Sequence, residues 1–468
     1  MKSTANILII IVTWNKKDYV IDLLNSLSSM TFPRKQLDIL VIDNASDDGT
    51  VAALEAQFKD IQIIRNSENI GGTGGFNTGL AWAFEQDDSR YDYLWLLDND
   101  VVVHKNALSE LVAVLDENPD VAIAGSTMMQ LDYPWRINEM GAFVDKGCGR
   151  LIFNRHLEDI DSWQGTPVND LLNRDIDLSQ QLSDCQPSMD VDYVAAASLL
   201  IRAPVARQAG LWMDFFIHFD DVEWCLRIAN AGHRIVVSAK SLIWHLSAVA
   251  KVPSWILYYD NRNIHYLLEK HSDKGAVKNS LRWTLKKALY YNLLGKHDLA
   301  ALHVQAIEDY QQGITGKKDI RLPYKSEAIA NISAILANPT IKKVLIPWTV
   351  KLQSSNAQTI IVKAMKQRPE LQVFYITPPP FIEKALVCQI PGAIPLAVPK
   401  SSLLRYLHYF KLRNQFDLVF QSDYQPILPL SWLADKILFI NNENYCLRPK
   451  PDLRKTMKGL PDLIRKWN

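Results

Sequence analysis

Features typical of disulfide-bonded, zinc-binding and membrane-spanning proteins are missing from this sequence. Its 468 residues include only five cysteines, and no two of them form a CxxC pair. This spacing predicts neither a disulfide framework nor a zinc site, and it fits a reducing cytoplasm best. The apolar run at residues 7–12 is too short to span a bilayer, and no small-residue cleavage site follows it. We therefore expect it to be a first strand and not a signal segment.

Net charge is absent as well, because 51 basic residues balance 51 acidic ones. The balance hides an asymmetry: residues 341–468 contain 19 Lys and Arg against eight Asp and Glu. A basic tail on an acidic body predicts an anionic partner. Charge alone leaves nucleic acid and anionic lipid open as that partner, and it leaves a merely solvated basic face open too.

Length and composition, with 48% apolar and 22% charged residues, indicate a soluble globular protein of two or three domains. Between residues 7 and 125, strands alternate with helical patterns at regular spacing, which predicts βαβ units and a mostly parallel sheet. We expect an α/β domain at 1–272, a helical segment and linker at 273–325, and a smaller basic α/β domain at 326–468. The helical segment is basic and aromatic in its first half, a pattern that fits a membrane surface and an interdomain contact equally well.

An apolar, aromatic-rich strand at residues 91–97 stops at two carboxylates, in Asp98-Asn99-Asp100. Ligands of open α/β sheets bind at the carboxyl ends of the strands. Two carboxylates there suit Mg²⁺ or Mn²⁺, above all when the ion can also hold the phosphates of a substrate. Asp and Asn are also favoured in turns, so this tripeptide alone fits a strand-ending turn equally well.

A glycine-rich stretch, residues 70–79, precedes that strand. Glycines let a backbone approach a ligand closely, and a following helix would offer its N-terminal amides to an anion. The stretch is neither a Walker A loop nor a GxGxxG motif. Taken alone, it is better interpreted as a flexible entry to a helix.

Three acids open an amphipathic helix near residue 220. Asp220 and Glu223 have the spacing of a capping box, which predicts Asp220 as the N-cap. That leaves Asp221 at the first helical position, facing the cleft, where the helix dipole would keep a general base ionised. His245, further on, lies beside apolar residues and is more typical of a core than of a ligand, unless it can meet Asp98 and Asp100. In that case its imidazole would favour Mn²⁺ over Mg²⁺.

Four motifs occur in a fixed order along the first 270 residues. They are Thr13-Trp14-Asn15 with Asp43-Asn44-Ala45-Ser46, then Asp98-Asn99-Asp100, Asp220-Asp221, and Trp244-His245. In this set the chain resembles the inverting glycosyltransferases of family 2, which have the GT-A fold. Three further segments most resemble the bacterial galactofuranosyltransferases, with rhamnosyltransferases next: Asn69–Phe76, Phe219–Glu223 and Tyr258–Asn263.

The resemblance implies roles for individual residues. It implies that Asp98, Asp100 and His245 hold Mn²⁺ or Mg²⁺, and that Asp221 is the catalytic base. Asp43 would lie near the base of the nucleotide. The expected nucleotide-sugar-binding residues are Thr13, Asn15, Asp43, Asn69, Gly71, Gly72, Gly74, Asn77, Asp98 and Asn99. Further site candidates are Asp220, Glu223, Trp135 and Trp244.

The activity implied is transfer of galactofuranose from UDP-galactofuranose to a hydroxyl of a growing bacterial surface glycan, such as an O-antigen. The acceptor would be carried on a polyprenyl diphosphate at the cytoplasmic face of the inner membrane. The basic tail would then face anionic lipid and not nucleic acid. Unlike the polymerising mycobacterial members, the chain shows no β-rich domain ahead of the sheet and carries the basic tail. Oligomeric state and processive polymerisation therefore stay open.

Three other functions remain as alternatives. Rhamnosyl transfer from dTDP-rhamnose would use the same residues. A metal-dependent nucleotidyltransferase could also use an acid pair at a sheet edge, but it would not need Asp221 there and would release pyrophosphate. An inactive GT-A scaffold that binds glycan would need none of the acids.

Overall fold

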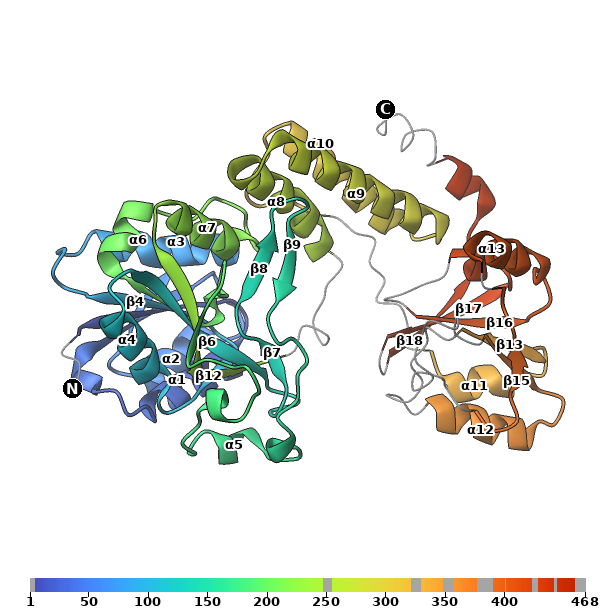
Figure 1. The fold of residues 1–468 in the computed structure, drawn as a ribbon, viewed down its shortest axis with the longest axis horizontal. Helices are drawn as coiled ribbons and strands as arrows, with labels where there is room; N and C mark the ends of the chain where they lie inside the picture. Colours follow the sequence, from blue (N-terminus) through green and yellow to red (C-terminus); the bar gives the residue numbers. More distant parts are fainter. Residues whose placement is uncertain are drawn as a thin grey trace. The chain divides into compact units, whose positions relative to one another are not determined.

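The computed structural model describes residues 5–246, 255–320, 330–347, 357–376, 390–399, 401–422, 428–441 and 444–458. The chain divides into two compact units, one of residues 1–284 and 305–320, the other of residues 285–304 and 321–468 (Figure 1). Residues 321–325 of the expected linker lie outside the described ranges. Within those ranges, no helix combines the length and the apolar character needed to cross a membrane.

The first unit is built on a ten-stranded sheet. Its main path runs β10-β12-β6-β11-β4-β1-β2-β3, with β5 added to β12 and β7 added to β6. The strands are β1 (Ile7–Thr13), β2 (Leu37–Asp43), β3 (Gln62–Arg65), β4 (Tyr93–Asp98), β5 (Val101–Val103), β6 (Val121–Gln130), β7 (Ile137–Glu139), β10 (Ser188–Asp190), β11 (Leu199–Arg202) and β12 (Arg234–His245). A separate hairpin consists of β8 (Ala142–Asp145) and β9 (Arg150–Phe153).

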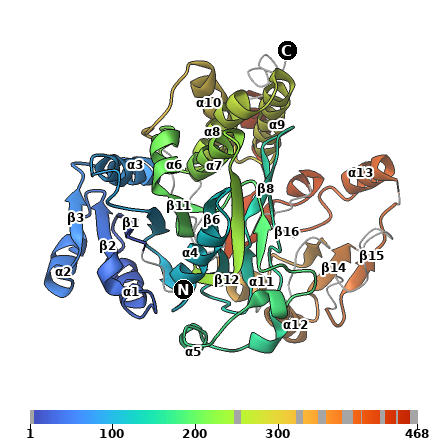
Figure 2. The same cartoon turned by 60° about the vertical axis from the view of Figure 1, so that its left-hand side comes forward.

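Along the main path of this sheet, four of the seven neighbouring pairs run parallel, and β1, β2 and β3 lie side by side (Figure 2). Strands β1 to β4 form parallel pairs, as do β6 and β12, while β11 lies antiparallel between β4 and β6. The predicted α/β architecture with a mostly parallel central sheet is therefore confirmed.

Helices cover both faces of the sheet, as a parallel sheet requires. They are α1 (Lys17–Ser28), α2 (Thr50–Gln57), α3 (Gly71–Phe84), α4 (Ala107–Glu117), α6 (Ala203–Ala209) and α7 (Asp220–Asn230). Alternate residues of a strand face opposite ways, so Leu8 and Ile10 of β1 pack in one core with α3, while Ile9 and Ile11 pack in the other with α1 and α4. Figure 1 shows α3, α6 and α7 gathered on the side of the unit opposite α1 and α2.

Two strands of this sheet have irregular surroundings. A 3₁₀ turn, η4 (Ala196–Ser198), directly precedes the short strand β11. The long strand β12 continues through a register shift between Ser238 and Leu242. A bulge of this kind lets a strand absorb extra residues without leaving the sheet.

The polar segment near residues 159–187 is anchored by a few apolar side chains. It contains the short helices η2 (Asp161–Trp163), α5 (Val168–Leu171) and η3 (Leu178–Gln180). Trp163, Leu171 and Leu178 are buried in the same core as α3. The short turn η1 (Arg34–Gln36) precedes β2.

Three longer helices follow β12 along the chain: α8 (Ile256–His271), α9 (Lys274–Leu293) and α10 (His297–Gln311). The second unit has a six-stranded sheet in the order β15-β14-β13-β16-β17-β18. Its elements are α11 (Ile332–Ala337), β13 (Lys343–Ile346), α12 (Ala357–Gln367), β14 (Gln372–Ile376), β15 (Ile394–Leu396), α13 (Ser402–Lys411), β16 (Leu418–Ser422), η7 (Leu428–Trp432), β17 (Lys436–Asn441) and β18 (Asn444–Pro449). All pairs but β17–β18 are parallel, so the tail is a second α/β sheet unit, as expected.

Candidate active site

The carboxyl ends of β1, β2 and β4 meet at one edge of the first sheet. In the parallel register Thr13 lies opposite Asp43, and Val12 lies opposite Asp98. The side-chain amide of Asn99 donates to Thr13 Oγ1 at 3.0 Å and ties the end of β4 to the end of β1. The residues expected to bind a nucleotide therefore adjoin those expected to bind a metal.

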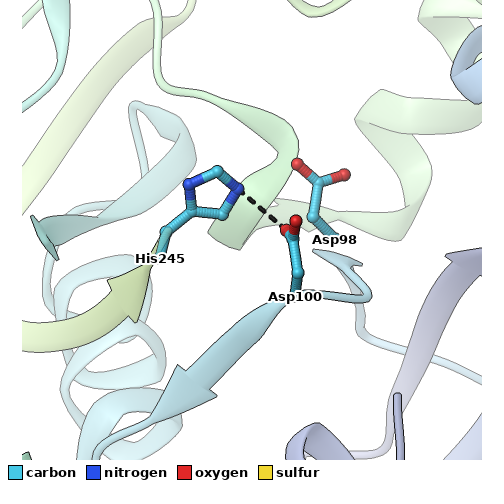
Figure 3. A group of neighbouring side chains, drawn as sticks. All are labelled: Asp98, Asp100 and His245. Atoms are coloured by element: carbon cyan, nitrogen blue, oxygen red, sulfur yellow. Dashed lines mark ion pairs between the residues drawn. The ribbon is translucent and has the colours of Figure 1, made fainter. Parts of the chain in front are cut away.

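Asp98, Asp100 and His245 form a group that we call the acid–imidazole cluster. Asp98 ends β4, Asp100 comes just before β5, and His245 ends β12. Because β12 pairs antiparallel with β5, with His245 opposite Val101, strand pairing brings the imidazole to the carboxylates. One ligand atom from each residue lies within 4.8 Å of the others, and His245 Nε2 is 2.9 Å from Asp100 Oδ1 (Figure 3).

The donor set of this cluster fits a divalent cation. All three side chains are partly buried, which limits competition from bulk water. Carboxylate oxygens suit Mg²⁺ and Mn²⁺, and the imidazole nitrogen favours Mn²⁺ of the two. The cluster can therefore hold a metal ion at the sheet edge.

Asp43 carries an unsatisfied oxygen at the same edge. The residue is fully buried, its Oδ2 accepts from the backbone N–H of Ser46 at 3.0 Å, and Arg65 Nε lies 3.4 Å from the same oxygen. Within the described part of the chain, Oδ1 has no hydrogen-bond partner. An orphaned buried acceptor is costly, so Asp43 Oδ1 is suited to an N–H of a bound ligand.

Three asparagines among the predicted nucleotide-binding residues form side-chain hydrogen bonds with backbone groups. Asn15 Oδ1 accepts from the N–H of Asp47 at 2.8 Å, which joins the loops after β1 and β2. Asn69 Oδ1 accepts from the N–H of Gly71 at 2.8 Å, where the chain enters α3. Asn77 exchanges two hydrogen bonds with the backbone of Trp212, at 2.8 and 3.0 Å, so both ends of its amide serve the fold.

The glycine-rich stretch is part of α3 itself, and most of its glycines serve packing. A Cβ on Gly71 would lie 2.0 Å from Phe216 O, and one on Gly79 would lie 2.4 Å from Ile10 of β1. Gly75 is equally tight against β1, whereas Gly72 faces open space. The expectation of a flexible entry is therefore wrong here: the glycines let α3 approach the sheet closely.

The prediction that Asp220 caps α7 is also wrong. The N-cap is Phe219, which has a left-handed φ of 66° and makes no side-chain cap bond. Asp220 is the first helical residue and is buried, and its Oδ2 accepts from Thr73 Oγ1 of α3 at 2.5 Å. Asp221 is thus the second helical residue and not the first. It is more exposed than Asp220, and it accepts from the N–H of Ala196 at 3.2 Å.

Burial raises the pKa of Asp221, and the neighbouring carboxylate of Asp220 raises it further. The backbone hydrogen bonds from Ala196 and Val222 act in the opposite direction but do not cancel these effects. Burial also raises the pKa of Asp220, against the hydrogen bond from Thr73. The expectation that the helix dipole keeps Asp221 ionised is therefore wrong, because burial and Asp220 raise its pKa instead. A raised proton affinity with partial exposure still fits a general base.

The sequence of the first unit is similar to a known protein family. Residues 8–164 match the family described as "Glycosyl transferase family 2". This segment of the chain is therefore similar to the family 2 glycosyltransferases. The matched range includes Asp98 and Asp100 but ends before Asp221 and His245, so their place in the site rests on the geometry.

The curated relatives of the chain are glycosyltransferases. Galactofuranosyltransferase GlfT2 of Mycobacterium tuberculosis is 24% identical over 319 residues, covering 66% of this chain and 49% of the relative. The GlfT2 of Mycolicibacterium smegmatis is 24% identical over 328 residues, covering 66% and 48%. Poly(ribitol-phosphate) beta-N-acetylglucosaminyltransferase TarS of Staphylococcus aureus is 26% identical over 110 residues, covering 24% and 19%. The chain spans about half the length of the first two relatives.

Three of the other site candidates, all in the first unit, have packing contacts. Glu223 is fully buried and pairs with Arg227 and Lys270, each at 2.7 Å, so it joins α7 to α8 and forms no capping box. Trp244 is fully buried, with its Nε1 donating to Pro134 O at 3.0 Å, which leaves no surface for a ligand. Trp135 is partly buried, with a neighbouring tyrosine ring edge-on to its indole.

Glu139, at the end of β7, is a residue of this site that the sequence patterns missed. Burial raises its pKa to about 7, against the opposing charge of His245. Its own charge in turn raises the pKa of Asp221, so it lies in electrostatic reach of both the cluster and the candidate base. The one local signal was an acid inside a short buried run.

Proposed function

We propose that this protein is a metal-dependent inverting glycosyltransferase. The observation that carries the proposal is the meeting, at one sheet edge, of the acid–imidazole cluster with the unsatisfied oxygen of Asp43. A nucleoside diphosphate sugar has an N–H-bearing base at one end and a charged diphosphate between the nucleoside and the sugar, and these two groups match the two features of the edge. The similarity to family 2 supports the same chemistry.

Binding of the donor would use the residues already at that edge. Asp43 Oδ1 would accept from the base, and Asp98, Asp100 and His245 would hold Mn²⁺ or Mg²⁺. When bound, the cation would neutralise charge on the diphosphate as it leaves. The side-chain bond from Asn99 to Thr13 keeps the two halves of the donor site in fixed register.

Asp221 is the proposed general base. Its carboxylate would take the proton of an acceptor hydroxyl while the oxygen bonds to the anomeric carbon. The bond from that carbon to the diphosphate oxygen breaks, and the nucleoside diphosphate departs from the opposite face. A general base of this kind typically contributes about 10²- to 10⁴-fold in rate.

Galactofuranose, from UDP-galactofuranose, is the proposed sugar, since both GlfT2 relatives are described as galactofuranosyltransferases. We further propose that the acceptor is a growing bacterial surface glycan on a polyprenyl diphosphate. The excess of basic residues in 341–468 would hold the protein at an anionic membrane surface. Sedimentation with anionic liposomes that is lost at high salt would support that contact, and equal sedimentation with neutral liposomes would oppose it.

The deciding experiment uses a panel of nucleotide sugars, with Mn²⁺ and a synthetic galactose-containing glycoside as acceptor. We expect transfer with release of nucleoside diphosphate. We expect Asp221→Asn to lower kcat about 10²- to 10⁴-fold without weakening UDP binding. Asp18→Asn is the matched control, because Asp18 is also the second residue of a helix, α1, but is exposed.

Other outcomes would identify the alternatives. Near-normal transfer by Asp221→Asn would remove Asp221 from the mechanism. Release of pyrophosphate would indicate a nucleotidyltransferase. Preference for dTDP-rhamnose would change the sugar, and absence of turnover with every donor would leave a glycan-binding scaffold.

A further inference from the structure

The loop at residues 215–219, just ahead of α7, has an unusual backbone. Phe216, His218 and Phe219 have φ angles of 68°, 65° and 66°, in the left-handed region that side chains with a Cβ disfavour. Such residues persist only where their surroundings fix them, and they cluster at functional sites. Three of the five loop residues are left-handed, and the loop directly precedes the helix that carries the candidate base. This indicates that the loop holds a side chain in a position that serves the site.

Two buried side chains of α8 hold the loop in this shape. The amide of Asn263 donates to the carbonyls of Ile217 and His218, at 2.8 and 3.0 Å, and lies 3.2 Å from that of Phe215. Arg262, also fully buried, donates to the carbonyl of Phe215 at 3.0 Å. The carbonyls of Phe215, Ile217 and His218 are therefore satisfied by side chains of α8 and not by backbone hydrogen bonds of a helix or strand.

The other side of the loop rests on α3. The carbonyl of Phe216 accepts from the N–H of Thr73 at 3.2 Å, and the same oxygen is what a Cβ on Gly71 would strike. The hydroxyl of Thr73 bonds to Asp220, so the loop and the start of α7 share one anchor. The loop is thus fixed between α8 and the end of α3 that adjoins the donor site.

His218 is the polar side chain that this loop turns outward. Phe215 and Phe216 are buried, whereas 44% of the His218 side chain is exposed. Its Nδ1 lies 2.6 Å from Asp260 Oδ1 of α8. With Nδ1 engaged, Nε2 is the polar atom left to meet a ligand, and the carboxylate sets the direction of the ring.

His218 is also cationic at neutral pH. Desolvation lowers its pKa, but the hydrogen bond and charge of Asp260, with the charges of Asp220 and Asp221, outweigh that effect and raise the pKa to about 9. His218 lies three residues before Asp221, so the loop and α7 together offer a hydrogen-bond donor and a proton acceptor. Neighbouring hydroxyls of a sugar are the complementary group, since one can lose its proton while the other accepts a hydrogen bond.

We propose that His218, oriented by Asp260, binds the acceptor sugar by donating from Nε2 to an oxygen next to the attacking hydroxyl. This inference rests on the proposed glycosyl transfer, and it makes His218 a determinant of acceptor specificity, with Asp260 as its positioning residue. An imidazolium placed to donate to one hydroxyl disfavours an acceptor sugar without that hydroxyl, because the N–H of His218 is then left without a hydrogen-bond partner.

Kinetics with the synthetic galactose-containing glycoside test the proposal in the full-length protein. We expect His218→Ala to raise the acceptor KM about 10- to 100-fold, which corresponds to loss of one charge-assisted hydrogen bond. The Kd for UDP should stay within about twofold of the wild type. His218→Lys should restore much of the acceptor KM because it restores a cationic donor. Asp260→Asn should raise the acceptor KM with little change in kcat.

Asp190→Asn is the control, because Asp190 belongs to an exposed ion pair with Arg234 at the opposite end of β12. Its acceptor KM should match the wild type. An unchanged acceptor KM in His218→Ala would overturn the inference, and so would a parallel loss of UDP binding or a lack of rescue by lysine. Those results would leave the proposed function standing if the wild type transfers sugar. A wild type that transfers no sugar would remove both.

Discussion

Replacing Glu223 by glutamine should destabilise the first unit in a pH-dependent way. The carboxylate is fully buried, and burial alone would raise its pKa, but hydrogen bonds from His271, Arg227 and Lys270 lower the pKa to about 2 from 4.5. This lowering of the pKa corresponds to roughly 3 kcal/mol of folding free energy. Glutamine keeps the size of the side chain but removes the negative charge that pairs with Arg227, Lys270 and His271.

The sign of the pH dependence follows from the lowered pKa of Glu223. Because the unfolded state binds this proton more readily, the contribution is complete above pH 4.5 and is lost as pH falls from there towards 2. Relative to wild type, Glu223→Gln should lose about 3 kcal/mol of unfolding free energy at pH 7. The difference should be roughly 1 kcal/mol smaller at pH 3.5.

Urea unfolding followed by tryptophan fluorescence measures this difference, since 10 of the 13 tryptophans belong to the first unit. Glu117→Gln, an exposed substitution on α4, should change the unfolding free energy by less than about 0.5 kcal/mol. Equal stability of Glu223→Gln and wild type at pH 7 would refute the reasoning, and so would a difference that does not shrink in acid.

Two other predictions follow from the site and from α3. His245→Ala should weaken Mn²⁺ binding at least tenfold in equilibrium dialysis without changing the fold, and unchanged affinity would remove the imidazole from the cluster. Gly79→Ala should cost about 1 to 3 kcal/mol in urea unfolding, because its Cβ would meet Ile10 at 2.4 Å. Gly72→Ala, which faces open space in the same helix, should be neutral or slightly stabilising, and equal losses in both variants would contradict the packing argument.

Local patterns predicted the strands and the acids at their ends, because these depend on residues close together in sequence. The unbroken apolar run of β1 could only be a strand covered on both faces. The carboxylates at the end of β4 indicated the functional edge, because they directly follow its apolar run in the sequence. His245 was tied to them only through a family resemblance, since nothing in Trp244-His245 shows that β12 pairs with β5.

Tertiary contacts decided the features that the sequence could not show. Asp220 has the spacing of an N-cap, but the chain enters α7 through left-handed Phe219, and the carboxylate is used by Thr73 of a distant helix. The glycines of α3 suggested a mobile entry until their neighbours on β1 were known. Glu139 gained its raised pKa from burial, which no local pattern records.

Strand pairing between β5 and β12 has a consequence for how a cation would be loaded into the cluster. His245 follows Asp100 by 145 residues, so the cluster exists only after the sheet has closed around β6 and β11. A chain emerging from the ribosome would hold the two aspartates long before the imidazole that completes them. Cation loading would then depend on formation of the whole first sheet, and a cation at 100 times its Kd would add about 2.7 kcal/mol to the stability of that sheet.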